Sequence, residues 1–202
     1  MSPLVTPPQL VLRNVRKVIT AGVGSCRVRV TVLGGVSLQL MPGDALAITG
    51  ALPLARSMLC AIAAGVARAD SGSARWGPRG LAGVRYAPAG DAPRALQRRD
   101  GLPAGLVILD AALTERAPAP DVRVLVALLR PWLACGGAAL VAAPLASGDA
   151  WPWPMLELAG GQLRPVLTPL PAEAPGHAMW SAPARMVAEG RADRMARGAP
   201  DR

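Results

Sequence analysis

The sequence predicts an α/β fold, in which a parallel sheet with helices is preceded by an antiparallel β flank. Short, uniformly apolar segments at 45–49, 106–109 and 138–142 are typical of strands buried on both faces of a parallel sheet. Segments with helical spacing of apolar residues alternate with them, as in βαβ units. Before residue 41, apolar and polar residues alternate instead, which indicates strands with one face in water.

The antiparallel flank is expected to begin with strands at 10–17 and 26–33. In the second segment, CRVRVTVL, the valines fall on one face and the arginines and threonine on the other. Gly34 and Gly35 then separate it from a further short strand, VSLQL. The sequence Pro-Gly-Asp at 42–44 predicts the tight turn that ends the flank.

The stretch 41–72 organises the rest of the chain. It contains the buried strand 45–49, a turn that begins at Gly50, and a helix predicted from about Ser57. The helix carries apolar residues at helical spacing, namely Met58, Leu59, Ile62 and Val66. A strand, a glycine turn and a helix form the arrangement that grips phosphate in many nucleotide-binding proteins.

Further strands and helices follow in alternation. We expect strands at 73–76, at 84–86 closed by Pro88, at 106–109 ending in Asp110, and at 138–142, then a hairpin over 155–164. We expect a helical turn or two near 94–99 and a helix at 122–135 that is interrupted near Pro131.

The elements predict one core domain at 1–170. Trp151 and Trp153, each followed by proline, are expected to cap its core. The remainder, 171–202, is a proline-, alanine- and arginine-rich basic tail.

The composition limits the classes of partner that the chain is expected to bind. The net charge of +9 permits contact with nucleic acid, an anionic membrane surface or an acidic protein. Neither a zinc-finger spacing nor an aromatic-plus-basic motif accompanies it, so no nucleic-acid partner is expected. Cys26, Cys60 and Cys135 are far apart, odd in number and without metal-ligand spacing, which favours a reducing compartment and no metal.

Two further features of the sequence favour a cytoplasmic protein. The N-terminus, MSPLVTPPQL, lacks the charged start and the apolar run of a signal peptide. The most apolar window, 45–67, has Arg56 at its centre with Pro53 and Gly50 beside it, and a charge is costly inside a bilayer.

The order of these segments resembles the ATP-binding subunit of ABC transporters, a P-loop NTPase. The resemblance is carried by TVLGGVSLQLMPGDALAITG, AAGVARADSGSARWGPRG, GLVILDAALTE, AALVAAP and MLELAGGQLRP, in this order and spacing. It covers about residues 9–166. It implies a nucleotide-binding fold whose phosphate site lies at 50–57.

Within that resemblance, the phosphate-binding pattern is degenerate. A working P-loop, Gly-x-x-x-x-Gly-Lys-Ser/Thr, holds phosphates and magnesium with backbone N–H groups, a lysine and a hydroxyl. Only Gly50 and Ser57 keep the pattern here. Pro53 removes one N–H group, Ala55 replaces the second glycine, and Arg56 replaces the lysine. The alternative is a purely structural turn between strand and helix.

Other functional positions of the family are also changed. Asp110 matches the metal-side carboxylate, although it can equally be a polar residue that ends a strand. Ala111 stands where the family places the glutamate that activates water. Neither a glutamine near Ala89 nor a histidine near Ala143 is present, and the sole histidine, His177, lies in the tail.

A helical subdomain with its LSGGQ signature is missing as well. Only about twenty residues separate Tyr86 from Leu106, where the family inserts it. The core is therefore expected to be a truncated ABC ATPase core, and the deletion argues against the ordinary mode of coupling to a permease.

The resemblance and the lost residues together predict a catalytically inactive, ABC-ATPase-like subunit, not an enzyme, with a structural or regulatory role in a membrane-associated, transporter-type complex. The expected partners are a membrane permease subunit, an intact ABC ATPase or both, and the chain is expected to be peripheral, through that partner, on the cytoplasmic face of the inner membrane.

No cofactor is expected. A residual site for ATP and Mg²⁺ would use Gly50, Arg56, Ser57 and Asp110. The alternatives are a nucleotide sensor that binds without hydrolysing, a basic nucleic-acid adaptor, and an unrelated enzyme on an α/β fold. The last has little support, because the sequence offers no Cys/His or Ser/His/Asp arrangement.

Overall fold

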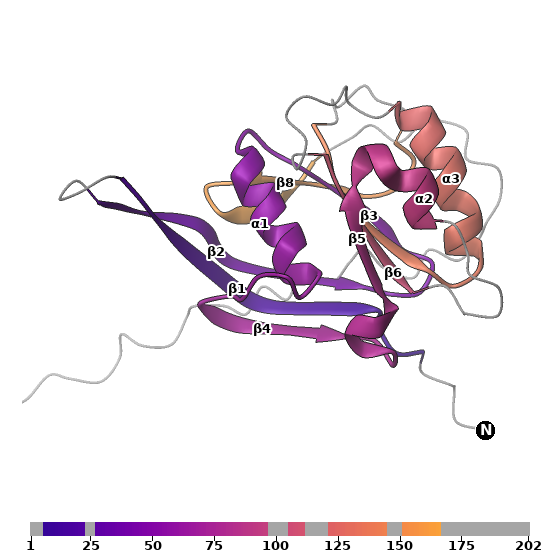
Figure 1. Ribbon diagram of the computed structural model, residues 1–202, viewed down its shortest axis with the longest axis horizontal. Coiled ribbons are helices and arrows are strands. Elements are labelled where there is room, and N and C mark those ends of the chain that lie inside the picture. Colours follow the sequence, from indigo (N-terminus) through magenta and orange to yellow (C-terminus); the bar gives the residue numbers. More distant parts are fainter. Residues whose placement is uncertain (1–5, 23–26, 97–104, 112–120, 145–150, 167–202) are drawn as a thin grey trace, which may run out of the picture.

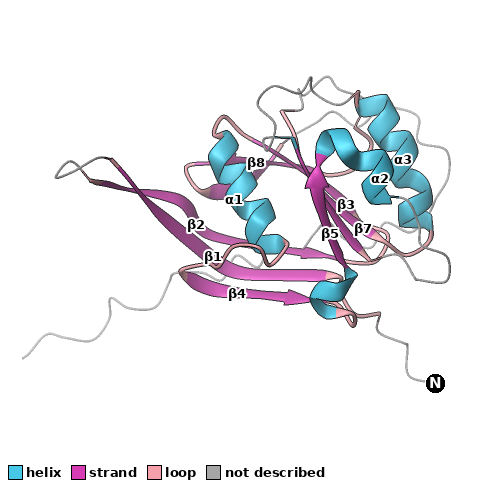
Figure 2. Ribbon diagram, in the orientation of Figure 1, coloured by secondary structure: helices cyan, strands magenta, loops and turns pink. Residues whose placement is uncertain are grey.

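The described part of the chain forms two sheets with one helix between them and two more helices on the outer face of the larger sheet (Figure 1). The computed structural model describes residues 6–22, 27–96, 105–111, 121–144 and 151–166. A three-stranded sheet has the order β2-β1-β4, and a six-stranded sheet has the order β5-β6-β7-β3-β8-β9. Helix α1 packs between the two sheets, whereas α2 and α3 cover the other face of the larger sheet (Figure 2).

The strands are β1 (Leu10–Ala21), β2 (Val28–Leu40), β3 (Ala45–Thr49), β4 (Ser71–Trp76), β5 (Val84–Pro88), β6 (Leu106–Asp110), β7 (Ala138–Ala142), β8 (Met155–Ala159) and β9 (Gln162–Pro165). The helices are α1 (Pro53–Ala63), α2 (Ala92–Leu96) and α3 (Val122–Ala134), with short 3₁₀ turns η1 (Gly80–Gly83) and η2 (Ala89–Asp91).

The larger sheet confirms the predicted fold class. Strands β5, β6, β7, β3 and β8 are parallel, and β9 closes the edge antiparallel to β8. Every residue of β3, β6 and β7 is buried, which explains their uniformly apolar sequences. Alternate side chains of these strands face α1 on one side and α3 on the other, so the sheet separates two hydrophobic clusters.

The antiparallel flank differs from its prediction in one respect. β2 is a single strand that runs through Gly34 and Gly35 without interruption. The glycines are accommodated by irregular register with β1, where Asn14 has a φ of 48° opposite this region, and by a φ of 113° at Gly35. The two glycines therefore bend one strand and do not separate two.

Both long helices also differ from their predictions. α1 begins at Pro53, one turn before the predicted Ser57, and ends at Ala63, so Val66 lies beyond the helix and is exposed. α3 continues through Pro131 instead of breaking there. Burial of Trp132 on the sheet side outweighs the cost of the proline, which itself lies on the exposed side of the helix.

The prediction that the tryptophan pair caps the core is confirmed. Trp151 is buried in the cluster under α3, and its ring meets that of Trp153 edge to face, with centroids 5.0 Å apart. The predicted tail at 171–202 and the domain boundary before it lie outside the described residues. No helix in the described ranges is long and apolar enough to cross a bilayer.

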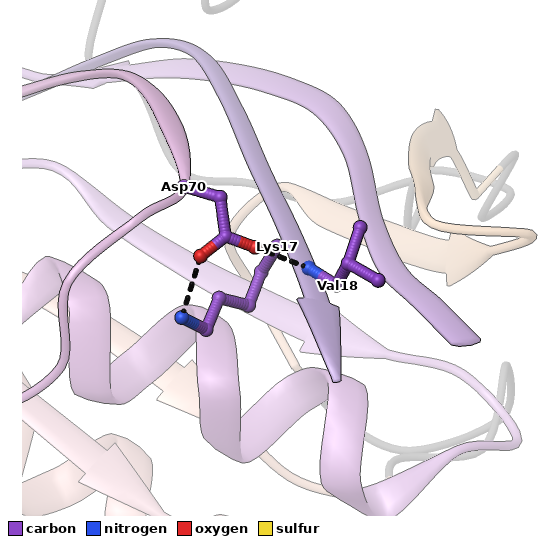
Figure 3. A network of polar contacts seen from close by, with 3 residues as sticks. All are labelled: Lys17, Val18 and Asp70. Atoms are coloured by element: carbon purple, nitrogen blue, oxygen red, sulfur yellow. Dashed lines mark hydrogen bonds and ion pairs between the residues drawn. The ribbon is translucent and has the colours of Figure 1, made fainter. Parts of the chain in front are cut away.

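Asp70 fastens the end of β4 to β1 (Figure 3). Its Oδ1 accepts a hydrogen bond from Lys17 Nζ at 2.8 Å, and its Oδ2 accepts one from the Val18 N–H at 2.7 Å. The pairing of β4 with β1 ends at Ser71 and Arg16. Asp70 therefore occupies the next β1 N–H group, which β4 does not pair, and its bonds to Lys17 and then Val18 lower its pKa.

We expect the Asp70 clamp to stabilise the fold only while the carboxylate is ionised. Because its pKa is lowered in the folded state, its contribution is complete above the ordinary value of 3.8 and is lost as pH falls through the lower folded value. Asp70→Asn should lower the melting temperature at neutral pH, and the gap to wild type should close in acid. Thermal melts followed by circular dichroism across pH measure this.

The matched control is Asp91→Asn, which changes an exposed carboxylate on η2. Its melting temperature should follow that of wild type at every pH. A gap between Asp70→Asn and wild type that stays constant down to low pH would contradict the electrostatic role of the clamp.

Candidate functional site

The candidate site lies at the carboxyl end of β3, where the chain turns into α1. Gly50 adopts a φ of 134°, and a Cβ atom at this position would clash with the backbone carbonyl of Leu158 on β8. Only glycine fits, because two backbones approach each other closely here. The retained first glycine of the predicted phosphate site thus has a packing role that needs no ligand.

The turn itself is closed by its own hydrogen bonds. The Leu52 carbonyl accepts from the N–H groups of Ala55 at 3.1 Å and Arg56 at 3.3 Å. Pro53 is the first residue of α1, where a missing N–H group and a fixed φ favour helix initiation. The helix therefore starts inside the segment that the P-loop pattern treats as loop, and two of its N–H groups are already paired.

Arg56 reaches back across the turn. Its side chain is only 5% exposed, and its guanidinium donates a hydrogen bond to the Gly50 carbonyl. Burial lowers the pKa of Arg56, while the nearby negative charge of Asp110 acts in the opposite direction. The cation at the position where the P-loop pattern has its lysine is thus folded inward against its own backbone.

Asp110 lies at the end of β6 and is completely buried. One of its carboxylate oxygens accepts a hydrogen bond from the Tyr86 hydroxyl on β5 at 3.1 Å. The parallel register places Tyr86 opposite Ile108, two residues before Asp110, so both side chains lie on the face that packs against α1. Burial, followed by the charge of Asp110, raises the pKa of Tyr86.

Cys60 completes this group from α1, one helical turn after Arg56. It is fully buried, and its pKa is raised well above the usual range by burial and then by Asp110, with Arg56 opposing. We call Arg56, Cys60, Tyr86 and Asp110 the buried polar cluster. Within it the Tyr86 hydroxyl donates to the Asp110 carboxylate, and the charges of Asp110 and Arg56 have opposite signs. The Arg56 Nε finds no partner among the described residues.

The structure brings together three of the four predicted site residues. Gly50 and Arg56 are hydrogen-bonded, and Asp110 interacts electrostatically with Arg56. Ser57 follows on α1 and is half-buried. Tyr86 and Cys60 were not predicted, because their roles depend on the register of β5 with β6 and on the rotation of α1. In the sequence, the only indication for Tyr86 is its place two residues before the end of β5, which pairs with the strand that ends in Asp110.

Groups that would do chemistry on a bound nucleotide are sparse around this cluster. Ala111 follows Asp110 and is partly exposed, and Ala143 directly follows β7 and is buried. Neither can act as a base. Among the described residues, no group of three or more His, Cys, Asp or Glu side chains is arranged to hold a metal ion.

Comparison with solved structures identifies the fold. A nucleotide-free ATP-binding cassette from an ABC transporter is similar, with a TM-score of 0.52 and 12% identity over 77% of this chain and 89% of that one. The dimeric post-hydrolysis structure of an ATP-binding cassette bound to ADP and Pi is equally similar, with a TM-score of 0.52 and 12% identity over 76% of this chain and 96% of that one. The chain therefore has the ABC ATPase fold.

Two comparisons of the sequence with known proteins found no match. No protein-family model matches the chain, and no curated protein matches it. At 12% identity, the likeness fixes the arrangement of the elements and leaves the chemistry of the site to be argued from its residues.

The buried polar cluster predicts the ionisation of the single tyrosine of the chain, Tyr86. In an alkaline titration of the folded protein, tyrosinate absorbance should appear only at a pH well above the ordinary pKa of 10.0. The substitution Asp110→Asn should lower the pH of this transition part of the way back toward 10.0. Stability that depends on the neutral phenol is complete below pH 10.0 and is lost as pH rises toward the folded pKa.

Asp44→Asn is the matched control, since Asp44 lies just before β3, at the opposite end of that strand from Gly50. It should leave the tyrosine titration unchanged. Circular dichroism at each pH confirms that the protein is still folded, and the urea-unfolded chain should titrate near 10.0. A normal titration in the folded wild type would refute the buried cluster.

Proposed function

We propose that this chain is a catalytically inactive, ABC-ATPase-like subunit with a structural or regulatory role in a membrane-associated, transporter-type complex. The single observation that carries the proposal is the closed turn at Gly50, in which Arg56 donates to the Gly50 carbonyl. The fold is that of an ATP-binding cassette, but several of the groups that would hold phosphate are bonded within the protein itself.

The closed turn disfavours phosphate on both geometric and electrostatic grounds. A phosphate site at a helix N-terminus needs N–H groups that point outward and are unpaired. Here Pro53 has no N–H group, and those of Ala55 and Arg56 are bonded to the Leu52 carbonyl. A phosphate would also have to draw the Arg56 guanidinium out of its buried position. Leu52 and Leu54 would then remain exposed beside a charged ligand.

Hydrolysis faces further obstacles. Ala111 supplies no carboxylate to orient water after Asp110, and Asp110 is engaged with Tyr86. In other enzymes, loss of one donor that stabilises transition-state charge costs about a hundredfold in rate. The chain has lost several such groups in the same place, so a residual rate is not expected to be measurable.

The proposed partners are a membrane permease subunit, an intact ABC ATPase, or both. The connection between β5 and β6 spans only residues 89–105, which leaves no room for the helical subdomain that the family uses in docking and in signature contacts. Affinity purification of the full chain with mass spectrometry tests this assignment. Recovery of a permease or of an intact ABC ATPase supports it, whereas recovery of neither contradicts it.

The second candidate function is a nucleotide sensor that binds without hydrolysing. The observation that favours it is that Gly50, Arg56 and Asp110 meet at the carboxyl end of the parallel strands, with Ser57 next on α1. This is where ligands bind in open α/β sheets. Such a sensor would require the turn to open before a nucleotide could enter.

Calorimetry and a phosphate-release assay decide between these functions. For the inactive subunit, ATP or ADP with Mg²⁺ should give no saturable heat, no shift in melting temperature and no phosphate release above that of Arg56→Ala or Asp110→Ala. Saturable heat without hydrolysis, lost in Arg56→Ala, would establish the sensor instead. Magnesium-dependent hydrolysis that both substitutions abolish would overturn the proposal.

A further inference from the structure

The outer end of the β1–β2 hairpin projects beyond the body of the molecule (Figure 1). β4 pairs with β1 only as far as Arg16, so from Val18 outward no third strand from the described part of the chain lies beside the two strands on that side. We call residues 18–21 and 27–31 the ribbon. It makes a two-stranded arm in which residues 27–31 are all exposed.

The ribbon has one apolar face and one basic face. Val28 and Val30 are 62% and 40% exposed, and they alternate along the strand with the exposed Arg27 and Arg29. Ile19 lies opposite Val30 in the register and packs against the core cluster beside α1. The valine face therefore continues the apolar inner face of the sheet outward, beyond the point where the core ends.

The charged residues of the hairpin itself are all basic. The first carboxylate in the sequence is Asp44, and the residues before it carry five cations, which are Arg13, Arg16, Lys17, Arg27 and Arg29. The carboxylate of Asp70, which comes from outside the hairpin, pairs with Lys17 and lies near Arg29. The hairpin thus carries a clear excess of positive charge around its exposed valines.

We propose that the ribbon is a direct contact site for an anionic lipid bilayer. Arginine binds phosphate groups through its planar fork, and its stem can lie along apolar surface while the charge reaches the headgroups. The valine face gives the same arm an apolar surface to bury at the boundary between headgroups and acyl chains. The charge and the exposed apolar side chains therefore match one partner.

Nucleic acid fits the ribbon less well. Bases are held by stacking on aromatic side chains, and the described ribbon residues consist of valine, isoleucine, threonine, alanine and arginine. A phosphodiester backbone would also leave the valines in water. Only the ribbon takes part in the proposed contact, which is therefore independent of the closed turn at Gly50.

Flotation with lipid vesicles tests the proposal on the full chain. Wild type should bind vesicles of phosphatidylcholine mixed with phosphatidylserine, bind phosphatidylcholine vesicles poorly, and detach as salt is added. The double substitution Arg27→Gln and Arg29→Gln should lower the affinity roughly 25-fold, at about fivefold per arginine. The isosteric pair Val28→Thr and Val30→Thr should lower it roughly tenfold.

Matched controls are available on α3, away from the ribbon. Arg123→Gln with Arg130→Gln removes the same charge from exposed positions, and Val124→Thr makes the same isosteric change at a 55% exposed valine. These variants should bind as wild type does. Unchanged melting temperatures would show that every variant is folded.

Several outcomes would overturn the proposal. They are an absence of vesicle binding, an equal loss in the ribbon and α3 variants, and full displacement by inorganic phosphate at the ionic strength of a chloride control, which would indicate a simple anion site. Ribbon-dependent binding of a labelled oligonucleotide without vesicle binding would assign the arm to nucleic acid instead. ATP hydrolysis, in contrast, would leave this result untouched.

Discussion

The position of α1 depends on a buried guanidinium at its first turn. Arg56 donates to the Gly50 carbonyl at the end of the central strand, and at the other end of the helix Trp76 Nε1 donates to the Ala63 carbonyl at 2.7 Å. The helix is thus bonded at one end to the turn that leaves the larger sheet and at the other to the smaller sheet. Removing one partner of a buried charge typically costs several kcal/mol, so the position of α1 is sensitive to the contact between Arg56 and Gly50.

The tryptophans provide similar hydrogen bonds in a core that is otherwise built mainly from leucine, alanine and valine. The chain has no phenylalanine. Besides Trp76, the indole of Trp132 donates to the Ala138 carbonyl at 3.1 Å, and that of Trp151 donates to the Pro154 carbonyl at 3.3 Å. Each indole therefore packs against one of the two apolar clusters and also donates a hydrogen bond to a nearby backbone carbonyl.

Sequence reasoning reached the fold because burial on both faces leaves an unmistakable composition in β3, β6 and β7. It placed the start of α1 too late because the P-loop pattern treats 50–57 as loop, whereas Pro53 and the residues after it form a favourable first helical turn. It divided β2 at Gly34 and Gly35 because bulges are set by the partner strand.

In the site, Arg56 and Asp110 were predicted from their positions in the pattern. Tyr86 and Cys60 were not, because they join the cluster through strand register and helix rotation, which the local sequence does not encode.

The burial of Cys60 has a practical consequence for studying motion in this protein. Its thiol faces the sheet with no exposed surface and a raised pKa, whereas Cys135, at the end of α3, is exposed. An alkylating reagent can reach Cys60 only when α1 separates from the sheet, since the thiolate must form and meet the reagent. The labelling rate at this position therefore measures how often α1 separates from the sheet, at equilibrium and without denaturant.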